Sequence, residues 1–394
     1  MVIILIREGN HSRFLAGKRR EILEKTKAIS TAQLLCMAFI GGMVIKMFML
    51  PSLLAQTVGR DGVFVMLFYM VVEIINLALI ITLIKKYPSV TFYEMLCDLF
   101  GSVVSRIIVC VCVLAAAFKF LLNLSEIKAF FSTSMFDSVT WEIMLVPLLA
   151  LCVAIGIKSL RVIGRSAEIF LPVIIVGMIM LAVIVFVEAP LENALPLLAN
   201  GISSVMDGIA RFPMWFGDVL VLVVAMGNVR IDKRMVLKAV VVRVIVAVVV
   251  LMFSVVLFAT YGNVTSVIGY GHNVTSLTQY NLGSQEYGRF DLIIYSLWLL
   301  GVFLKIAMTF YFIVRGVAFV LKTEKLTPIA VAVAVAVYLL SLFVFPSQSD
   351  MFTLSTGWAK YVFCAAEYLV PPILAIGSAI KYRKREGKRL ESRS

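Results

Sequence analysis

Long apolar segments alternate with shorter polar segments along this chain. Apolar runs of about 20 residues, long enough to cross a bilayer as an α-helix, recur from near Gln33 to Ile380. Strand-like alternation is absent, so the runs predict helices. The ten predicted spans, each uncertain by a few residues at its ends, cover 33–57, 62–84, 103–131, 141–158, 167–187, 213–229, 236–261, 290–315, 327–346 and 357–380. An amphipathic piece, Phe92–Phe100, is expected at the cytosolic surface between the second and third spans.

Composition assigns the chain to a class. It is 61% hydrophobic and 15% charged, with a mean hydropathy of +1.01, which leaves too little polar surface for a soluble protein. The predicted fold class is therefore an all-α integral membrane protein in a lipid bilayer. The net charge of +13 does not indicate a nucleic-acid partner, because the basic residues occupy short loops and the two ends of the chain.

The loop charges predict the orientation. One side of the predicted topology carries the N-terminal segment, Lys85-Lys86, the loops around 158–165, 230–238 and 322–325, and the basic C-terminal end. The other side carries only Arg60, Arg211, Arg289 and Lys360. An excess of Lys and Arg marks the cytosolic side, so both termini are expected there. The predicted organisation is a basic tail (1–28), a membrane domain (29–380) and a second basic tail (381–394).

The ten spans divide into five and five, and each half opens with an interrupted helix. The first interruption is Gly41-Gly42, and the second is Phe216-Gly217, in a span expected to begin at Pro213. Paired interruptions at corresponding places predict an inverted-repeat transporter fold with broken helices 1 and 6 and a site at the unwound backbone. The segments Glu188–Phe212 and Gly262–Arg289 are expected as outer connections, and the second could hold a short helix or form a lid.

Three segments carry a family resemblance. They are the run Leu50-Pro51-Ser52-Leu53-Leu54-Ala55-Gln56-Thr57-Val58-Gly59-Arg60-Asp61, the triplet Phe216-Gly217-Asp218, and Gly288-Arg289-Phe290-Asp291 with Trp298 and Lys305. Over residues 30–380 the chain resembles the B subunits of bacterial spore germinant receptors, which belong to the amino acid–polyamine–organocation transporter superfamily. This family usually has an acidic residue at position 287 or 288 and an aromatic residue at position 63, where this chain has Tyr287, Gly288 and Val63.

The resemblance implies a leucine-transporter type of fold and a role in sensing. The ligand would be a small nutrient, usually an amino acid, recognised in the spore inner membrane. The implied partners are a germinant-receptor A subunit and a lipoprotein C subunit. Two further hypotheses remain open, a proton-coupled amino acid permease with full alternating access and a scaffold whose cavity is vestigial.

The candidate ligand-binding residues surround the two interruptions. Freed amides around Gly41, Gly42 and Met43 could hold a ligand carboxylate, whereas the alternative is that these small residues serve helix packing. At the second interruption, Gly217 is the corresponding candidate, and the neighbouring Trp215 and Phe216 could form an aromatic wall over a ligand side chain or pack as ordinary core residues.

Six charges are predicted to lie near mid-depth in the bilayer. They are Lys46, Glu73, Lys119, Asp218, Lys305 and Glu367. Charges at this depth are costly, so they are expected to face a cavity or one another. Two interpretations stay open. In one, a neutral network of ion pairs fixes helix register. In the other, protonation of one carboxylate, or insertion of the ligand at one of the lysines Lys46, Lys119 and Lys305, moves the network between two states.

The remaining polar residues are expected to be structural. Glu126 and Lys128 are interpreted as a solvated cap, and Arg243 and Arg315 as snorkelling side chains near cytosolic ends. The six cysteines lack metal-ligand spacing, and no cofactor is expected. No nucleophile–base pair or phosphate loop is evident, so the chain is not expected to be an enzyme.

Overall fold

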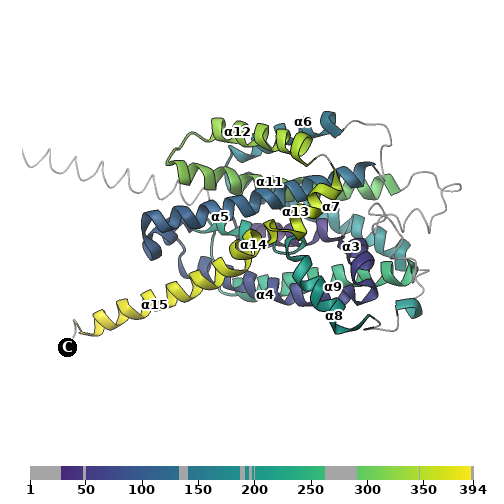
Figure 1. Cartoon of the computed structure of the whole chain (residues 1–394). Coiled ribbons are helices and arrows are strands. Elements are labelled where there is room, and N and C mark those ends of the chain that lie inside the picture. The colour runs from purple at the N-terminus through teal and green to yellow at the C-terminus, as the bar shows by residue number, and fades with distance from the viewer. Residues whose placement is uncertain are drawn as a thin grey trace, which may run out of the picture.

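A computed structural model describes residues 28–47, 50–132, 141–186, 191–194, 198, 200–261, 291–345 and 347–391 of the chain (Figure 1). The predicted tail before residue 28 and the predicted lid-like connection after Tyr261, including Gly288 and Arg289, lie outside these residues. In the first half the elements are α2 (Thr31–Met43), η1 (Ile45–Met47), α3 (Leu50–Thr57), η2 (Gly59–Asp61), α4 (Gly62–Lys86), α5 (Phe92–Phe130), α6 (Trp141–Gly156) and α7 (Leu160–Phe186). In the second half they are η4 (Leu191–Ala194), α8 (Gly201–Arg211), η5 (Pro213–Trp215), η6 (Leu220–Ala225), α9 (Met235–Tyr261), α11 (Asp291–Leu321), α12 (Leu326–Leu339), η8 (Leu340–Val344), α13 (Gln348–Thr356), α14 (Ala359–Cys364), η9 (Ala365–Leu369) and α15 (Val370–Glu391).

The membrane-spanning pattern agrees with the prediction. Within the described residues, seven helices are long and apolar enough to cross a membrane, and two bent pairs bring the number to nine. The shorter apolar helix α6 occupies the place of the predicted fourth span. Together these elements account for the ten spans, and the chain is a multi-pass membrane protein.

Both interruptions are present, but each differs in detail from the prediction. The pair α2 and α3 is bent by 46°, and the pair formed by α8 with η5 and η6 is bent by 61°. The predicted start of the sixth span at Pro213 is wrong. Its first half is α8, which had been assigned to an outer connection, and Pro213 stands just after the bend, where its missing N–H costs no helical hydrogen bond.

Corresponding spans of the two halves pack on one another. Helix α4 contacts α9, α5 contacts α11, and α6 contacts α12, so the second, third and fourth spans each lie against the span five places later. Contacts between equivalent helices are expected where two repeats meet about a pseudo-two-fold axis. The arrangement places the breaks of the first and sixth spans inside the bundle, where α2 and η6 also touch.

A short backbone pairing joins the start of the first span to the end of the sixth. The Ile29 amide donates to the Asn228 carbonyl (2.8 Å), and the Arg230 amide donates to the Ile29 carbonyl (2.9 Å). Next to this bridge, the Thr31 hydroxyl donates to the Arg230 carbonyl (2.7 Å), and Ser30 caps α2. The two interrupted spans are thus tied together at one end of the bundle.

The predicted amphipathic piece forms the start of α5. Gly101 has a φ of 79° and a ψ of 168°, so the helical direction changes there and separates Phe92–Phe100 from the long span that follows. At the same end of the molecule, α15 continues past the predicted boundary at residue 380 and projects beyond the bundle (Figure 1). The Lys381 ammonium holds Asp98 of the first α5 segment at 2.6 Å.

Candidate functional site

Gly41 and Gly42 are not unwound. Both lie in the last turn of α2 with Met43, and the break begins after them, at Val44 and η1. The reason is Pro51 in the first turn of α3, because a helix running through this position would need the N–H that proline lacks. The expectation that the glycine backbone is itself the open segment is therefore wrong.

Gly42 instead makes room for a buried arginine. A Cβ at this position would overlap Nη1 of Arg243 and stand 2.7 Å from its Cζ. Arg243 comes from α9, is 2% exposed, and lies 2.5 Å from the Glu73 carboxylate. The interpretation of Arg243 as a snorkelling side chain is wrong, since the missing side chain at Gly42 lets it reach across α2 into the bundle.

Glu73 joins three elements at the first break. One of its oxygens, Oε1, accepts from the Lys46 ammonium at 2.5 Å and from the Gly217 amide at 2.6 Å. The other oxygen faces Arg243. Helix α4 thus supplies the carboxylate that links the broken first span, the broken sixth span and α9.

Asp218 is the second centre of charge. Its Oδ2 lies 3.0 Å from Lys46, and its Oδ1 lies 2.9 Å from Lys305 and 3.5 Å from Lys119. All three ammonium groups are buried. Three cations from three helices therefore converge on one carboxylate in the sixth-span break.

The open backbone of the sixth-span break is satisfied by charged side chains. Gly217 has a φ of 70°, which turns the chain out of the helical path. The Lys119 ammonium donates to the carbonyls of Met214 (2.5 Å) and Phe216 (3.2 Å). On the other side of the break, the Glu367 carboxylate accepts from the amides of Val219 (2.8 Å) and Leu220 (3.1 Å). These amides begin η6 and would otherwise lack partners.

Five of the six predicted mid-depth charges form one paired cluster, and Arg243 joins it. Lys46, Glu73, Lys119, Asp218 and Lys305 form the paired cluster together with Arg243, whereas Glu367 bonds to backbone amides. Glu126 is 4% exposed, so its interpretation as a solvated cap is wrong. Among the described residues, the charged side chains buried around the two breaks are Lys46, Lys119, Arg243, Lys305, Glu73, Glu126, Asp218 and Glu367, and Asp61 is buried apart from them, where it accepts from the Asn200 amide.

The aromatic residues beside the break are packed. Phe216 stacks on Tyr69 with ring centroids 4.4 Å apart and an angle of 14° between the planes. Trp215 lies edge-on to Phe212 and near Phe352. Both Trp215 and Phe216 are buried. These contacts agree with the packing interpretation and leave ligand contact a prediction.

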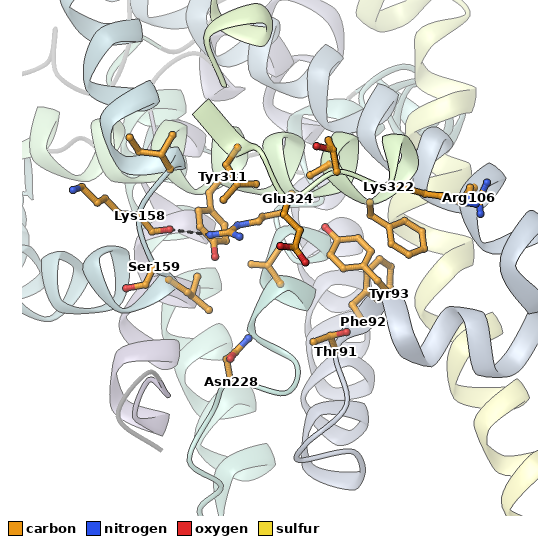
Figure 2. A pocket seen from close by; sticks show the side chains of 18 of the residues that line it. Thr91, Phe92, Tyr93, Arg106, Lys158, Ser159, Asn228, Tyr311, Lys322 and Glu324 are labelled. Carbon is orange, nitrogen blue, oxygen red and sulfur yellow. Dashed lines mark hydrogen bonds between the residues drawn. The ribbon is translucent and has the colours of Figure 1, made fainter. Parts of the chain in front are cut away.

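Two cavities accompany the network. A small cavity of about 20 Å³, the size of a water molecule, is lined by Lys119, Gly217, Asp218, Thr309 and Glu367 among others. A much larger one, about 920 Å³, opens at the predicted cytosolic end, with Tyr93, Arg106, Lys158, Tyr311 and Lys322 around it (Figure 2). The C-terminal part of η6 reaches its wall through Val224. The bundle is therefore hollow toward one end and tightly filled at the charge network.

The described residues contain no group of three or more His, Cys, Asp or Glu side chains that could hold a metal ion.

A family model described as spore germination protein matches residues 28–349. The chain belongs to this family. The resemblance drawn from the sequence motifs is thereby confirmed at the family level. Among curated proteins, no relative matches this spore germination protein.

A solved structure supports the fold of the spore germination protein. Mhp1, a nucleobase-cation-symport-1 family transporter in a closed conformation with bromovinylhydantoin bound, superposes with a TM-score of 0.60. The match covers 89% of this chain and 78% of Mhp1 at 13% sequence identity. At that identity the likeness concerns the fold alone, and it confirms the predicted transporter architecture with two interrupted helices.

Proposed function

We propose that this protein is the membrane subunit of a spore nutrient receptor. It binds a small nutrient, an amino acid, at the two helix breaks and signals to A and C subunits. Residues 29–380 form the ligand-binding membrane domain in the spore inner membrane, and both tails lie in the cytosol. Membership of the spore germination family and the transporter-like fold support a nutrient-binding role.

One observation carries the mechanism. The amides that a ligand carboxylate would use at the sixth-span break are held by Glu73 and Glu367, two side chains of the protein. A ligand can take these amides only if one of the glutamates withdraws, and each is anchored in a different helix, α4 or η9. Binding is then linked to a displacement of a helix. The ligand binds the displaced state more tightly than the resting state, and this difference in affinity is what a two-state switch needs.

The lysines have a defined role in this proposal. Lys119 and Lys305 face Asp218 from α5 and α11, and Lys46 bridges Asp218 and Glu73. A ligand carboxylate that displaces a glutamate brings a replacement negative charge to these ammonium groups. The exchange keeps the buried network close to neutral, which avoids the cost of an unpaired charge in the bilayer.

The second candidate is a proton-coupled amino acid permease, which the cytosolic vestibule of about 920 Å³ favours as an exit path. The two functions differ in flux. We expect the amino acid to raise the unfolding temperature of the purified chain in detergent. Proteoliposomes that contain the chain are expected not to accumulate the amino acid. Ligand-driven uptake by the chain alone would contradict a purely sensory role and support the permease.

Partner assembly is tested separately. The chain is expressed together with germinant-receptor A and C subunits, and a tag on this chain is used for purification. Recovery of both subunits in one complex is expected. A chain that purifies alone under these conditions, yet still transports, would exclude the receptor proposal.

A further inference from the structure

One face of α5 carries three buried polar side chains. Lys119, Asn123 and Glu126 are spaced four and three residues apart, so they lie one above another on the helix. Their exposed fractions are 4%, 1% and 4%. Glu126 is seven residues beyond Lys119, which places it about 10 Å further along the axis, toward the predicted outer side.

Two of these side chains carry polar atoms that lack hydrogen-bond partners among the described residues. Both amide atoms of Asn123, Oδ1 and Nδ2, are buried and unpartnered, and so is Oε1 of Glu126. Lys305 Nζ, close to Asp218, also makes no well-aligned hydrogen bond there. Buried polar groups in native proteins nearly always find partners in protein or ordered water, so a concentration of unpartnered ones on a single helix face marks a place where a polar molecule would be bound.

The surroundings define the chemistry of such a molecule. The Glu126 carboxylate is within hydrogen-bonding reach of the Trp215 indole and close to Lys119 and Lys305. Helix α5 is fixed against α11 on either side of this place by the aromatic pairs Phe120–Phe310 and Phe130–Tyr295. A free carboxylate oxygen requires a donor, an amide offers both donor and acceptor, and the lysines offer donors to an anion.

We propose that Asn123 and Glu126 form the ammonium-recognising part of the ligand site. The proposal rests on the proposed function and names its substrate class. The ligand is a small zwitterion whose ammonium group bonds to Glu126 Oε1 and the Asn123 carbonyl oxygen. Its carboxylate points inward, to the lysines around Asp218. Glu126 is thus a specificity-determining residue that selects amino acids over simple carboxylic acids.

The test removes the charge and the ligand amine independently. The purified full-length chain is screened with the standard L-amino acids, and affinity is measured for each one that binds. The same measurement is made with the deaminated carboxylic acid of that amino acid. The variants are Glu126→Gln and Asn123→Leu, and Glu142→Gln on α6 is the control because it removes a carboxylate outside the bundle core.

We expect Glu126→Gln to lower the affinity for the amino acid about tenfold or more, since charge-assisted hydrogen bonds are the strong ones. It should leave the affinity for the deaminated acid unchanged, so the preference for the amino acid over the acid becomes smaller in the variant. Asn123→Leu should also lower the affinity for the amino acid. Glu142→Gln should leave the affinities for both ligands unchanged.

Two results would overturn this proposal and leave the proposed function intact. One is unchanged amino acid affinity in Glu126→Gln, and the other is an equal loss for the amino acid and its deaminated acid, which would indicate a structural effect. If no amino acid binds the wild-type chain, the amino acid part of the proposed function fails as well. The unfolding temperature of Glu126→Gln without ligand is measured as well, and a folded variant with the selective loss of amino acid affinity supports the proposal.

Discussion

Replacing Gly42 with alanine is the sharpest test of the buried ion pairs. The added methyl group would overlap Nη1 of Arg243 and stand 2.7 Å from its Cζ, so the guanidinium has to move. Its ion-pair contact with Glu73 is 2.5 Å long and buried, so moving the guanidinium away leaves a buried charge without its partner. We expect Gly42→Ala to separate Arg243 from Glu73.

The size of the effect follows from a comparison of neighbouring glycines. Disrupting a buried pair so that one charge loses its partner costs about 3 kcal/mol at the low end of measured values. Alanine favours the helix over glycine by about 1 kcal/mol, so Gly42→Ala should lower the free energy of unfolding by about 2 kcal/mol in total. At Gly41 the new methyl group meets only Met308 Cε, at 3.6 Å, an ordinary contact. Gly41→Ala gains the same helix propensity without an overlap, so the free energies of unfolding of the two variants should differ by about 3 kcal/mol.

The measurement is unfolding in detergent, followed with a thiol-reactive dye. Cys112 and Cys152 are both fully buried and become reactive when the bundle opens. Combining Gly42→Ala with Arg243→Met relieves the overlap, so the double variant should be no less stable than Arg243→Met alone. Equal stability of the Gly41 and Gly42 variants, or full additivity in the double variant, would refute the reasoning.

Two further predictions use the same kind of matched pair. Gly217→Ala combines a φ of 70° with a Cβ that would stand 2.5 Å from Glu367 Cγ, whereas Gly101→Ala has a φ of 79° and nothing within 4 Å. Gly101→Ala should lower the free energy of unfolding by the backbone strain alone, about 1–3 kcal/mol, because its ψ of 168° at positive φ suits glycine only. Gly217→Ala adds a steric overlap and should cost at least about 1 kcal/mol beyond its own backbone strain, measured by thermal unfolding. The second prediction concerns membrane orientation. A cysteine in place of Lys86 should react with a membrane-impermeant maleimide only from the cytosolic side, and a cysteine in place of Lys360 only from the outer side. The reverse labelling would contradict the predicted topology.

The ten spans could be predicted because each needs a long apolar run, and such runs are visible without knowledge of the fold. The charges in those runs were equally visible. Lys46, Asp218 and Lys305 interrupt apolar sequence, and a charge in the bilayer has to find a partner. The identity of each partner was not predictable, since Lys46 meets Glu73 and Asp218 through packing of helices that are far apart in the sequence.

The errors at Arg243 and Glu126 have one physical origin, which is that sequence position does not give the direction of a side chain. Arg243 is about two turns into α9, close enough to a helix end to suggest snorkelling, yet a missing Cβ on another helix draws it inward. Glu126 is near the end of α5 and faces the core. Gly41 and Gly42 resembled a break because glycine destabilises helices, whereas Pro51 sets the end of the helical run.

The backbone bridge at Ile29 limits how the protein can change shape. The hydrogen bonds from Ile29 to Asn228 and from Arg230 to Ile29 make the start of α2 and the end of the sixth span one mechanical unit. Asn228 also lines the large vestibule, so a tilt of α2 moves part of the vestibule wall with it. The two interrupted helices then share a single degree of freedom at this end. Any signal that leaves the bundle there is the displacement of a pair of helices.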